Sequence, residues 1–211
     1  MSEEAKIHLS PLEMEVVSNT QWIFTKQIII DKVYHLFGLL HDEYKKSVAL
    51  EKEFLPAYFQ KPGGKIAKGE KYNGLPYLIL DYPAMYQKEN VFAVRTMFWW
   101  GNFFSISLHL SGKYFKSLNN ISECLTFLRG KNFFVCVNEN EWEHDFYSSN
   151  FIGINELDAK QKERIIEKSF FKIAKKIQLE KWESAPHFLI QTFNEIIEFV
   201  KISYPGGEIV L

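Results

Sequence analysis

Two apolar runs meet at Gly101-Asn102, and this feature constrains the fold more than any other. The runs, 91–100 and 103–111, are rich in aromatic and β-branched residues, which favour strands over helices. A Gly-Asn pair between two such runs is typical of a two-residue hairpin turn. The sequence therefore predicts an antiparallel hairpin, and with it a sheet, in the middle of the chain.

A two-residue turn fixes the expected pairing of these strands. Trp100 would oppose Phe103, Trp99 would oppose Phe104, and side chains would alternate between the two faces of the sheet. One face would then be apolar apart from Arg95. A shift of one residue would move every side chain of one strand to the other face, so all inferences about these faces depend on the turn. The other face would combine aromatic rings with polar groups and include Thr96, Trp100, Ser105, Ser107 and His109.

This second face is the expected ligand-binding surface. Rings supply contact area and a few hydroxyl or imidazole groups orient a ligand. Two alternatives stay open: the serines are small enough to let a helix approach the sheet, or the face is solvated. A small molecule or a protein partner is therefore expected here, without a prediction of its identity.

Arg95 is the anomaly of the apolar face. A guanidinium keeps its charge and is costly to bury without a partner. Asp81, at the end of the preceding expected strand, is the candidate carboxylate. Either the two form a buried bridge that fixes the strand register, or Arg95 holds an anionic ligand.

The remaining patterns predict one α+β domain over residues 1–211, with a mostly antiparallel sheet of four to five strands. N-terminal helices are expected at 10–50, the sheet region at 76–155 with one inserted helix, and two C-terminal helices packed on the sheet at 158–203. The Gly- and Lys-rich stretch 61–74 reads as a loop. The other expected strands are 77–81, 133–137 and 151–154, and the inserted helix is 113–128.

Capping residues set the helix boundaries. Ser10, Pro11 and Glu13 form a capping-box pattern with proline at the first helical position,. Asp158 is expected to cap a helix that runs to about Trp182, whose lysines would form a solvated side. Ser184 is expected to cap the last helix, with an inward stripe of Leu189, Phe193, Ile196 and Val200.

Composition excludes several partners and compartments. The net charge of −1 provides no general attraction to nucleic acid or to an acidic membrane,. No run approaches 18 apolar residues, and residues 1–7 carry no apolar signal core. Cys124 and Cys136 are expected to be small buried hydrophobes rather than a disulfide framework, which favours the cytoplasm.

The segment 141–145 gathers three acids, a tryptophan and His144. Oxygen ligands could hold a hard cation there, but one short run rarely supplies enough of them. We therefore expect neither a metal nor another cofactor. An imidazole beside carboxylates could also act as a general base.

Two classes of function follow from these patterns. Missing catalytic motifs and an aromatic content of 16% favour a non-catalytic binding or interaction module, with homodimerisation as a further expectation. The alternative is an enzyme for a small anionic substrate, in which Arg95 holds the anion and His109 or His144 is the base. In the expected pairing Arg95 and His109 lie on opposite faces, which weakens this alternative.

Overall fold

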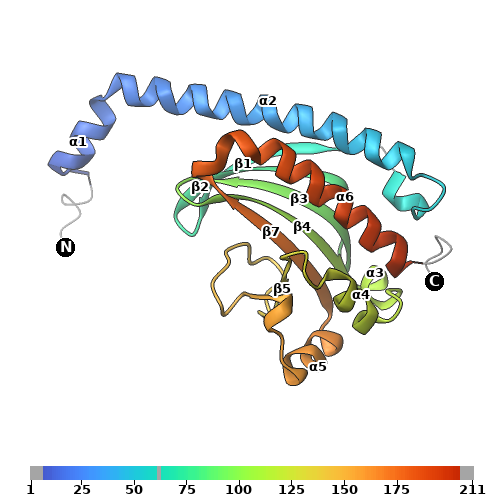
Figure 1. Cartoon of the computed structure of the whole chain (residues 1–211). Coiled ribbons are helices and arrows are strands. Elements are labelled where there is room, and N and C mark those ends of the chain that lie inside the picture. Colours follow the sequence, from blue (N-terminus) through green and yellow to red (C-terminus); the bar gives the residue numbers. More distant parts are fainter. Residues whose placement is uncertain (1–6, 61–62, 205–211) are drawn as a thin grey trace. The chain divides into compact units, whose positions relative to one another are not determined.

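The computed structural model describes residues 7–60 and 63–204 (Figure 1). Residue contacts divide the chain into two compact units, residues 1–36 and residues 37–211. The division falls inside the long helix α2 (Thr20–Leu50), which contributes its first part to one unit and its second part to the other. Most of the expected polar N-terminus, residues 1–6, and the first two residues of the expected loop, 61 and 62, lie outside the described residues.

The first unit begins with helix α1 (Pro11–Ser18), as predicted. Ser10 Oγ accepts a hydrogen bond from the Glu13 amide at 3.3 Å, and the Glu13 carboxylate accepts one from the Ser10 amide at 2.7 Å. Asn19 separates α1 from α2, and its side chain accepts from the Trp22 amide at 2.9 Å. Local capping therefore fixes both helix starts, although no residue of α1 is buried,.

A seven-stranded antiparallel sheet dominates the second unit, in the order β1-β2-β3-β4-β7-β5-β6. The predicted α+β class is confirmed, but the sheet has more strands than the four or five expected. The strands are β1 (Lys65–Tyr72), β2 (Leu75–Gln87), β3 (Asn90–Trp99), β4 (Phe103–Ser111), β5 (Phe134–Cys136), β6 (Phe151–Gly153) and β7 (Phe170–Gln178).

Strand β1 forms where the glycines predicted a loop, so that prediction is wrong. Gly69 pairs with Tyr77 of β2, and a Cβ on Gly69 would lie 2.4 Å from the Tyr77 ring. The glycine therefore lets the neighbouring ring cover the backbone rather than making the chain flexible. The exposed lysines of β1 suit an edge strand, because charge there discourages pairing with other chains,.

Strand β7 also replaces a predicted structure, the second half of the helix expected from Asp158. The helix α5 (Ala159–Glu167) starts with the predicted Asp158 cap, but the chain then extends from Phe170 to Gln178 between β4 and β5. The spacing of Ile173 and Ile177 fits a helix and also one face of a strand. Pairing with β4 along the whole strand decides between them.

The other helices lie close to their predicted positions. The expected helix 113–128 is broken into two after Lys116, and Asn120, in a left-handed backbone conformation, caps the second part with its side chain, which accepts from the Glu123 amide at 3.4 Å. Ser184 occupies the predicted start of the last helix without making a side-chain cap. The predicted inward stripe of that helix is fully buried. These helices are α3 (Lys113–Lys116), α4 (Ile121–Leu128) and α6 (Ala185–Ser203), with short 3-10 turns at Ala57–Gln60, Ile154–Glu156 and Leu179–Ser184.

The hairpin forms as predicted, but its register differs by one residue. Trp99 rather than Trp100 opposes Phe103, so Trp100, Gly101 and Asn102 form a three-residue loop, and Gly101 adopts a φ of +69°. A residue in the left-handed region is the usual way to close such a loop. The expected face assignments are therefore wrong: Arg95 shares a face with Ser107 and His109, and Thr96 lies on the opposite face with Ile106.

One face of the sheet packs against α6 and the second part of α2 and forms the apolar core (Figure 1). The Tyr44 ring stacks on Phe193 with centroids 3.9 Å apart. Tyr44 Oη lies 3.1 Å from Thr96 Oγ1, so each buried hydroxyl has a partner. Thr96, expected to face a ligand, therefore belongs to the helix-covered core.

Gly112 provides a test of the backbone geometry that ends β4. Its φ is +58°, and an added Cβ would lie 2.1 Å from the Glu89 carbonyl oxygen. Gly130 has a φ of +73° with nothing within 4 Å of such a Cβ. We expect Gly130→Ala to lower the free energy of unfolding by about 1 kcal/mol and Gly112→Ala by about 3 kcal/mol or more. Urea denaturation of both variants measures the difference, and equal losses would contradict the close approach to Glu89.

Candidate functional site

The sheet face opposite α6 carries a cluster of buried polar side chains, here called the polar face. Strand register places them together: Asp81 opposes Arg95, Arg95 opposes Ser107, and His109 opposes Lys172. Each of these side chains except Arg95, which is part-buried, has less than a tenth of its surface exposed. The polar face comprises Asp81 from β2, Arg95 from β3, Ser105, Ser107 and His109 from β4, and Lys172 from β7.

A bidentate ion pair joins Arg95 to Asp81. Arg95 Nε donates to Asp81 Oδ1 at 2.7 Å and Nη2 donates to Oδ2 at 2.8 Å, while Nη2 also donates to Tyr86 Oη at 3.0 Å. Burial opposes the charged guanidinium, but the bonds and charge of Asp81 outweigh it, so the pKa of Arg95 is raised. The structure thus contains the bridge expected between these residues. Of the three guanidinium nitrogens, only Nη1 makes no hydrogen bond to Asp81 or Tyr86.

Residues 138–150, here called the covering segment, lie over the polar face without forming a helix or a strand. Lys172 Nζ donates to the backbone oxygen of Glu141 at 3.0 Å and to that of Glu143 at 2.5 Å. Tyr72 Oη accepts from the amides of His144 and Asp145, at 2.6 and 3.0 Å. Side chains of the sheet thus satisfy the backbone groups that a segment without secondary structure leaves unpaired.

The imidazole of His144 lies between two basic groups. Its Nε2 is 3.3 Å from Arg95 Nη1, and its Nδ1 is 3.4 Å from Lys172 Nζ. Burial first, and then the charges of Lys172 and Arg95, lower the pKa of His144 well below its ordinary value. His144 is therefore neutral, with one ring nitrogen able to accept a hydrogen bond.

His109 has a carboxylate partner on the same segment. His109 Nε2 lies 2.8 Å from Glu141 Oε2, and the ring packs edge-on against Trp142. Burial lowers the pKa of His109, partly offset by the bond to Glu141, and that bond in turn lowers the pKa of Glu141. A pair of this kind can transfer a proton once solvent or a ligand reaches it.

Sequence reasoning found part of this site. The structure brings together Asp81, Arg95, Ser105, Ser107 and His109, and separates Thr96 and Trp100 from them: Thr96 is in the core and Trp100 is in the hairpin loop, with its ring against Phe98. Lys172 was missed because 170–178 was expected to be helix with its lysines in solvent. A partial signal was present, since Phe171, Ile173 and Ile177 alternate with Lys172 and Lys176 as on a strand, although Lys175 interrupts the apolar face.

No group of three or more metal-ligating side chains is found in the part of the chain that the structure describes. Beside carboxylates and hydroxyls, the polar face and the covering segment bring together the Lys172 amine, the imidazoles of His109 and His144, and Arg95 Nη1.

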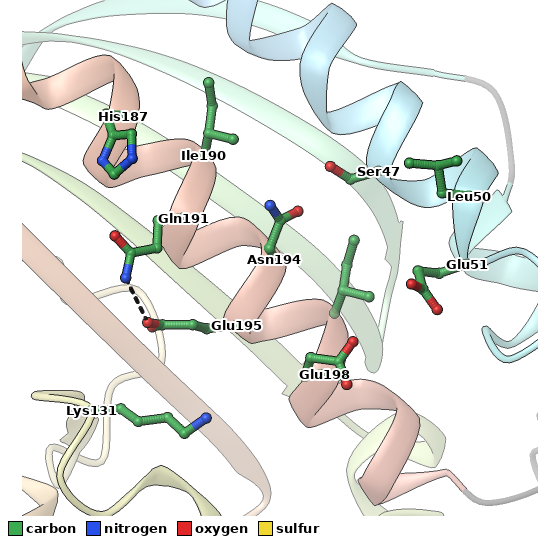
Figure 2. Close-up of a pocket in the computed structure, with 11 residues that line it drawn as sticks. Ser47, Leu50, Glu51, Lys131, His187, Ile190, Gln191, Asn194, Glu195 and Glu198 are labelled. Carbon is green, nitrogen blue, oxygen red and sulfur yellow. Dashed lines mark hydrogen bonds between the residues drawn. The ribbon is translucent and has the colours of Figure 1, made fainter.

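A groove of about 590 Å³ lies between α2 and α6 within the second unit (Figure 2). Its acids already have partners: Glu51 and Glu198 bind Lys201, and Glu195 binds Lys175. Gln191 also donates to Glu195, as the dashed line in Figure 2 marks. We assign no ligand to this groove because each of its carboxylates already binds a lysine of the protein.

The first unit carries a second candidate surface, here called the arm (residues 7–36). Its α1 and the start of α2 form a groove of about 450 Å³ lined by apolar residues and one acid. A large side chain has roughly 150–250 Å² of surface, so the half-exposed apolar residues here present on the order of 1,000 Å². These residues are Ile7, Leu9, Leu12, Met14, Val16, Val17, Trp22, Ile23, Phe24 and Ile28.

Comparison with protein-family models, with curated proteins and with solved structures gives no match. Among residues 7–60 and 63–204, no helix combines the length and the apolar character needed to cross a bilayer. Function therefore has to be argued from the polar face and the arm themselves.

The Arg95–Asp81 bridge makes a prediction for stability. Asp81→Asn leaves a buried guanidinium without its carboxylate, and we expect a loss of about 3–5 kcal/mol in the free energy of unfolding. The double variant Arg95→Met/Asp81→Leu removes both charges and is expected to cost less than Asp81→Asn alone. Urea denaturation of the three proteins tests this, and a double variant less stable than the single one would contradict it.

Lys172 makes a prediction for pH dependence. Burial lowers its pKa from 10.5 to about 8, so between these values the unfolded chain binds more protons than the folded chain. The free energy of unfolding therefore rises with pH in this range, by up to about 1.4 kcal/mol per pH unit. We expect this rise in the wild-type protein relative to Lys172→Met in urea titrations between pH 8 and 10.5. Parallel pH profiles would show that Lys172 has an ordinary pKa.

Proposed function

We propose that this chain is a non-catalytic protein-interaction module that binds a second copy of itself through the arm. One observation carries the proposal: the arm exposes large apolar side chains on two preformed helices, around an almost entirely apolar groove. Apolar patches of this size on a monomer mark interaction surfaces. The residues predicted from the sequence to bind a ligand are less suitable. The covering segment lies over Ser107 and His109, and the helices cover Thr96.

The arm is already ordered for binding. The capping box at Ser10 and Glu13 and the Asn19 cap fix both helix starts, although no residue of α1 is buried. A preorganised surface loses less conformational entropy on association than one that folds while binding. The apolar area is thus available to stabilise a complex.

Charge and area indicate the kind of partner. The arm has three acids, Glu13, Glu15 and Asp31, and two lysines, Lys26 and Lys32, so its net charge is −1 with histidines neutral. Helices that bind anionic membranes carry a basic polar face, which favours a protein partner here. A standard interface takes roughly 800 Å² from each partner, so the groove residues Leu12, Val16, Val17, Trp22 and Ile23 would form its centre and other exposed apolar residues of the arm its periphery. A two-fold dimer, the commonest oligomer, supplies a partner with the same apolar surface.

The compartment belongs to the same proposal. Cys124 and Cys136 are buried and free, which supports a reducing environment, and we place the protein in the cytoplasm.

Leu12→Asp/Phe24→Asp is expected to convert a dimer into a monomer. Both residues are more than three-fifths exposed, so the substitutions introduce charge at the interface and leave the second unit's core unchanged. We expect the dimer dissociation constant to rise at least about 30-fold, as for loss of interface hot spots. Light scattering coupled to size exclusion, and analytical ultracentrifugation, measure it.

Ile166→Asp serves as the matched control, because Ile166 is a half-exposed apolar residue on α5. It should leave the dimer unchanged. A monomeric wild-type protein at high concentration, or an arm that binds lipid vesicles in preference to protein, would overturn the proposal.

A further inference from the structure

A small cleft lies in the second unit where α4, α5 and the turn at Ile154–Glu156 meet. Its volume is about 230 Å³, below the roughly 300–1,000 Å³ of pockets that enclose a whole drug-sized molecule. The cleft therefore has room for one functional group and the atoms next to it. The lining residues are Ser122, Leu125, Thr126 and Arg129 along one side of α4 and at its end, Ile154 and Leu157 in and after the turn, and Lys162 on α5.

Two cations share this cleft without a counter-ion. Arg129 and Lys162 line it, and no carboxylate does. Within residues 7–60 and 63–204, neither side chain forms an ion pair. The fold brings these like charges to one small space from positions 33 residues apart in the sequence, and like charges repel each other at short range. An anion bound between them would remove this repulsion.

The acids closest in sequence are directed away from the cleft. Asp158 caps α5, since its Oδ1 accepts a hydrogen bond from the backbone amide three residues later at 2.7 Å. Glu156 lies against the turn, because its Oε1 would be only 3.1 Å from a Cβ on Gly153. Glu123 and Glu163 each follow a lining residue by one position, roughly 100° further around the helix, and do not line the cleft. The two cations are therefore left for a ligand.

A hydrogen bond inside α4 determines which hydroxyl is free to donate. Thr126 Oγ1 donates to the Ser122 backbone oxygen at 2.8 Å, so its single proton is used. Ser122 Oγ has no hydrogen-bond partner in the part of the chain that the structure describes. Arg129 and Lys162 can only donate. The cleft thus offers three kinds of donor to an anion: a guanidinium, an ammonium and one hydroxyl.

Apolar side chains form the rest of the wall. Leu125, Ile154 and Leu157 each have less than a tenth of their surface exposed, and such a wall favours contact with carbon atoms over contact with water. The Gly130 amide donates to Asn155 Oδ1 at 3.2 Å, which ties the end of α4 to the turn. The cleft is open in the structure, so no segment has to move to admit a ligand.

We propose that this cleft binds the phosphate group of a small phosphomonoester. Such a group carries a charge of about −1.5 to −2 near neutral pH, which balances Arg129 and Lys162. A guanidinium binds two phosphate oxygens at once and an ammonium binds as a point charge, so with the Ser122 hydroxyl each terminal oxygen has a donor. A carboxylate would bring only one charge and two oxygens. The apolar wall contacts the carbon atoms beyond the ester oxygen. The inference is independent of the arm and of the dimer.

Titration of the intact protein with phenyl phosphate tests the proposal. The readout is the set of backbone amide shifts in ¹H–¹⁵N NMR spectra, recorded near neutral pH at constant ionic strength. We expect saturable shifts at 121–130, 154–157 and 159–162, with a dissociation constant on the order of 1 mM or lower. Benzoate, which has the ring but one charge, should bind at least about tenfold more weakly. Inorganic phosphate, which has the charge but no ring, should bind at the same amides and more weakly than phenyl phosphate.

Matched variants separate the roles of the side chains. Arg129→Gln and Lys162→Gln should each raise the dissociation constant at least about tenfold, as for loss of a charged hydrogen-bond partner. Ser122→Ala should raise it by about two- to tenfold, as for loss of a neutral one. Thr126→Val is the control, because the proton of that hydroxyl is already bonded within α4, and the dissociation constant should stay the same. None of these four side chains is buried, so the variants keep the core intact.

Three results would each overturn the proposal. The first is the absence of saturable shifts at these amides at millimolar phenyl phosphate. The second is an unchanged affinity in both Arg129→Gln and Lys162→Gln, which would place the bound anion elsewhere on the protein. The third is benzoate binding as tightly as phenyl phosphate, which would identify a carboxylate site. A protein that is monomeric in light scattering would contradict the dimer alone and leave these titrations unaffected.

Discussion

A buried guanidinium next to a carboxylate sets the geometry of the polar face. Arg95 cannot lose its charge and must remain paired, so Asp81 has to stay opposite it across β2 and β3,. That requirement disfavours any shift of the two strands, because a shift would separate the charges inside the protein. It also leaves Arg95 Nη1 facing His144 Nε2 at 3.3 Å.

The covering segment depends on the same face. Its backbone lacks the regular hydrogen bonds of a helix or a strand, and side chains of β1 and β7 replace them. The cost is that a lysine and an imidazole lose water without gaining a carboxylate within bonding distance. A lowered pKa at Lys172 is the consequence of this exchange,.

The arm is stabilised by different interactions from those of the polar face. Its first helix is fixed by caps and has no buried residue, so the apolar side chains there stay exposed, whereas Val33 and Leu36 at the end of the arm are buried. The groups of the polar face, by contrast, are paired within the protein.

Sequence alone determined the features that depend on local chemistry. The Ser10 and Asp158 caps, the inward stripe of α6, the hairpin around Gly101-Asn102 and the pairing of Arg95 with Asp81 all follow from residue types and short spacings. Even so, the register predicted for the hairpin was wrong by one residue. Gly101 closes a three-residue loop, and the local sequence specifies the length of such a turn only weakly.

Only the tertiary structure decided what long-range pairing controls. Residues around Gly69 form the edge strand β1, in which the Tyr77 ring covers the glycine. Residues 170–178 form a strand because they pair with β4 along their whole length, although their apolar spacing also fits a helix. Those two strands bring Tyr72 and Lys172, which are 100 residues apart in the sequence, to the covering segment. No local sequence pattern predicts contacts between residues so far apart, because they depend on which backbone groups remain unpaired once the central hairpin has formed.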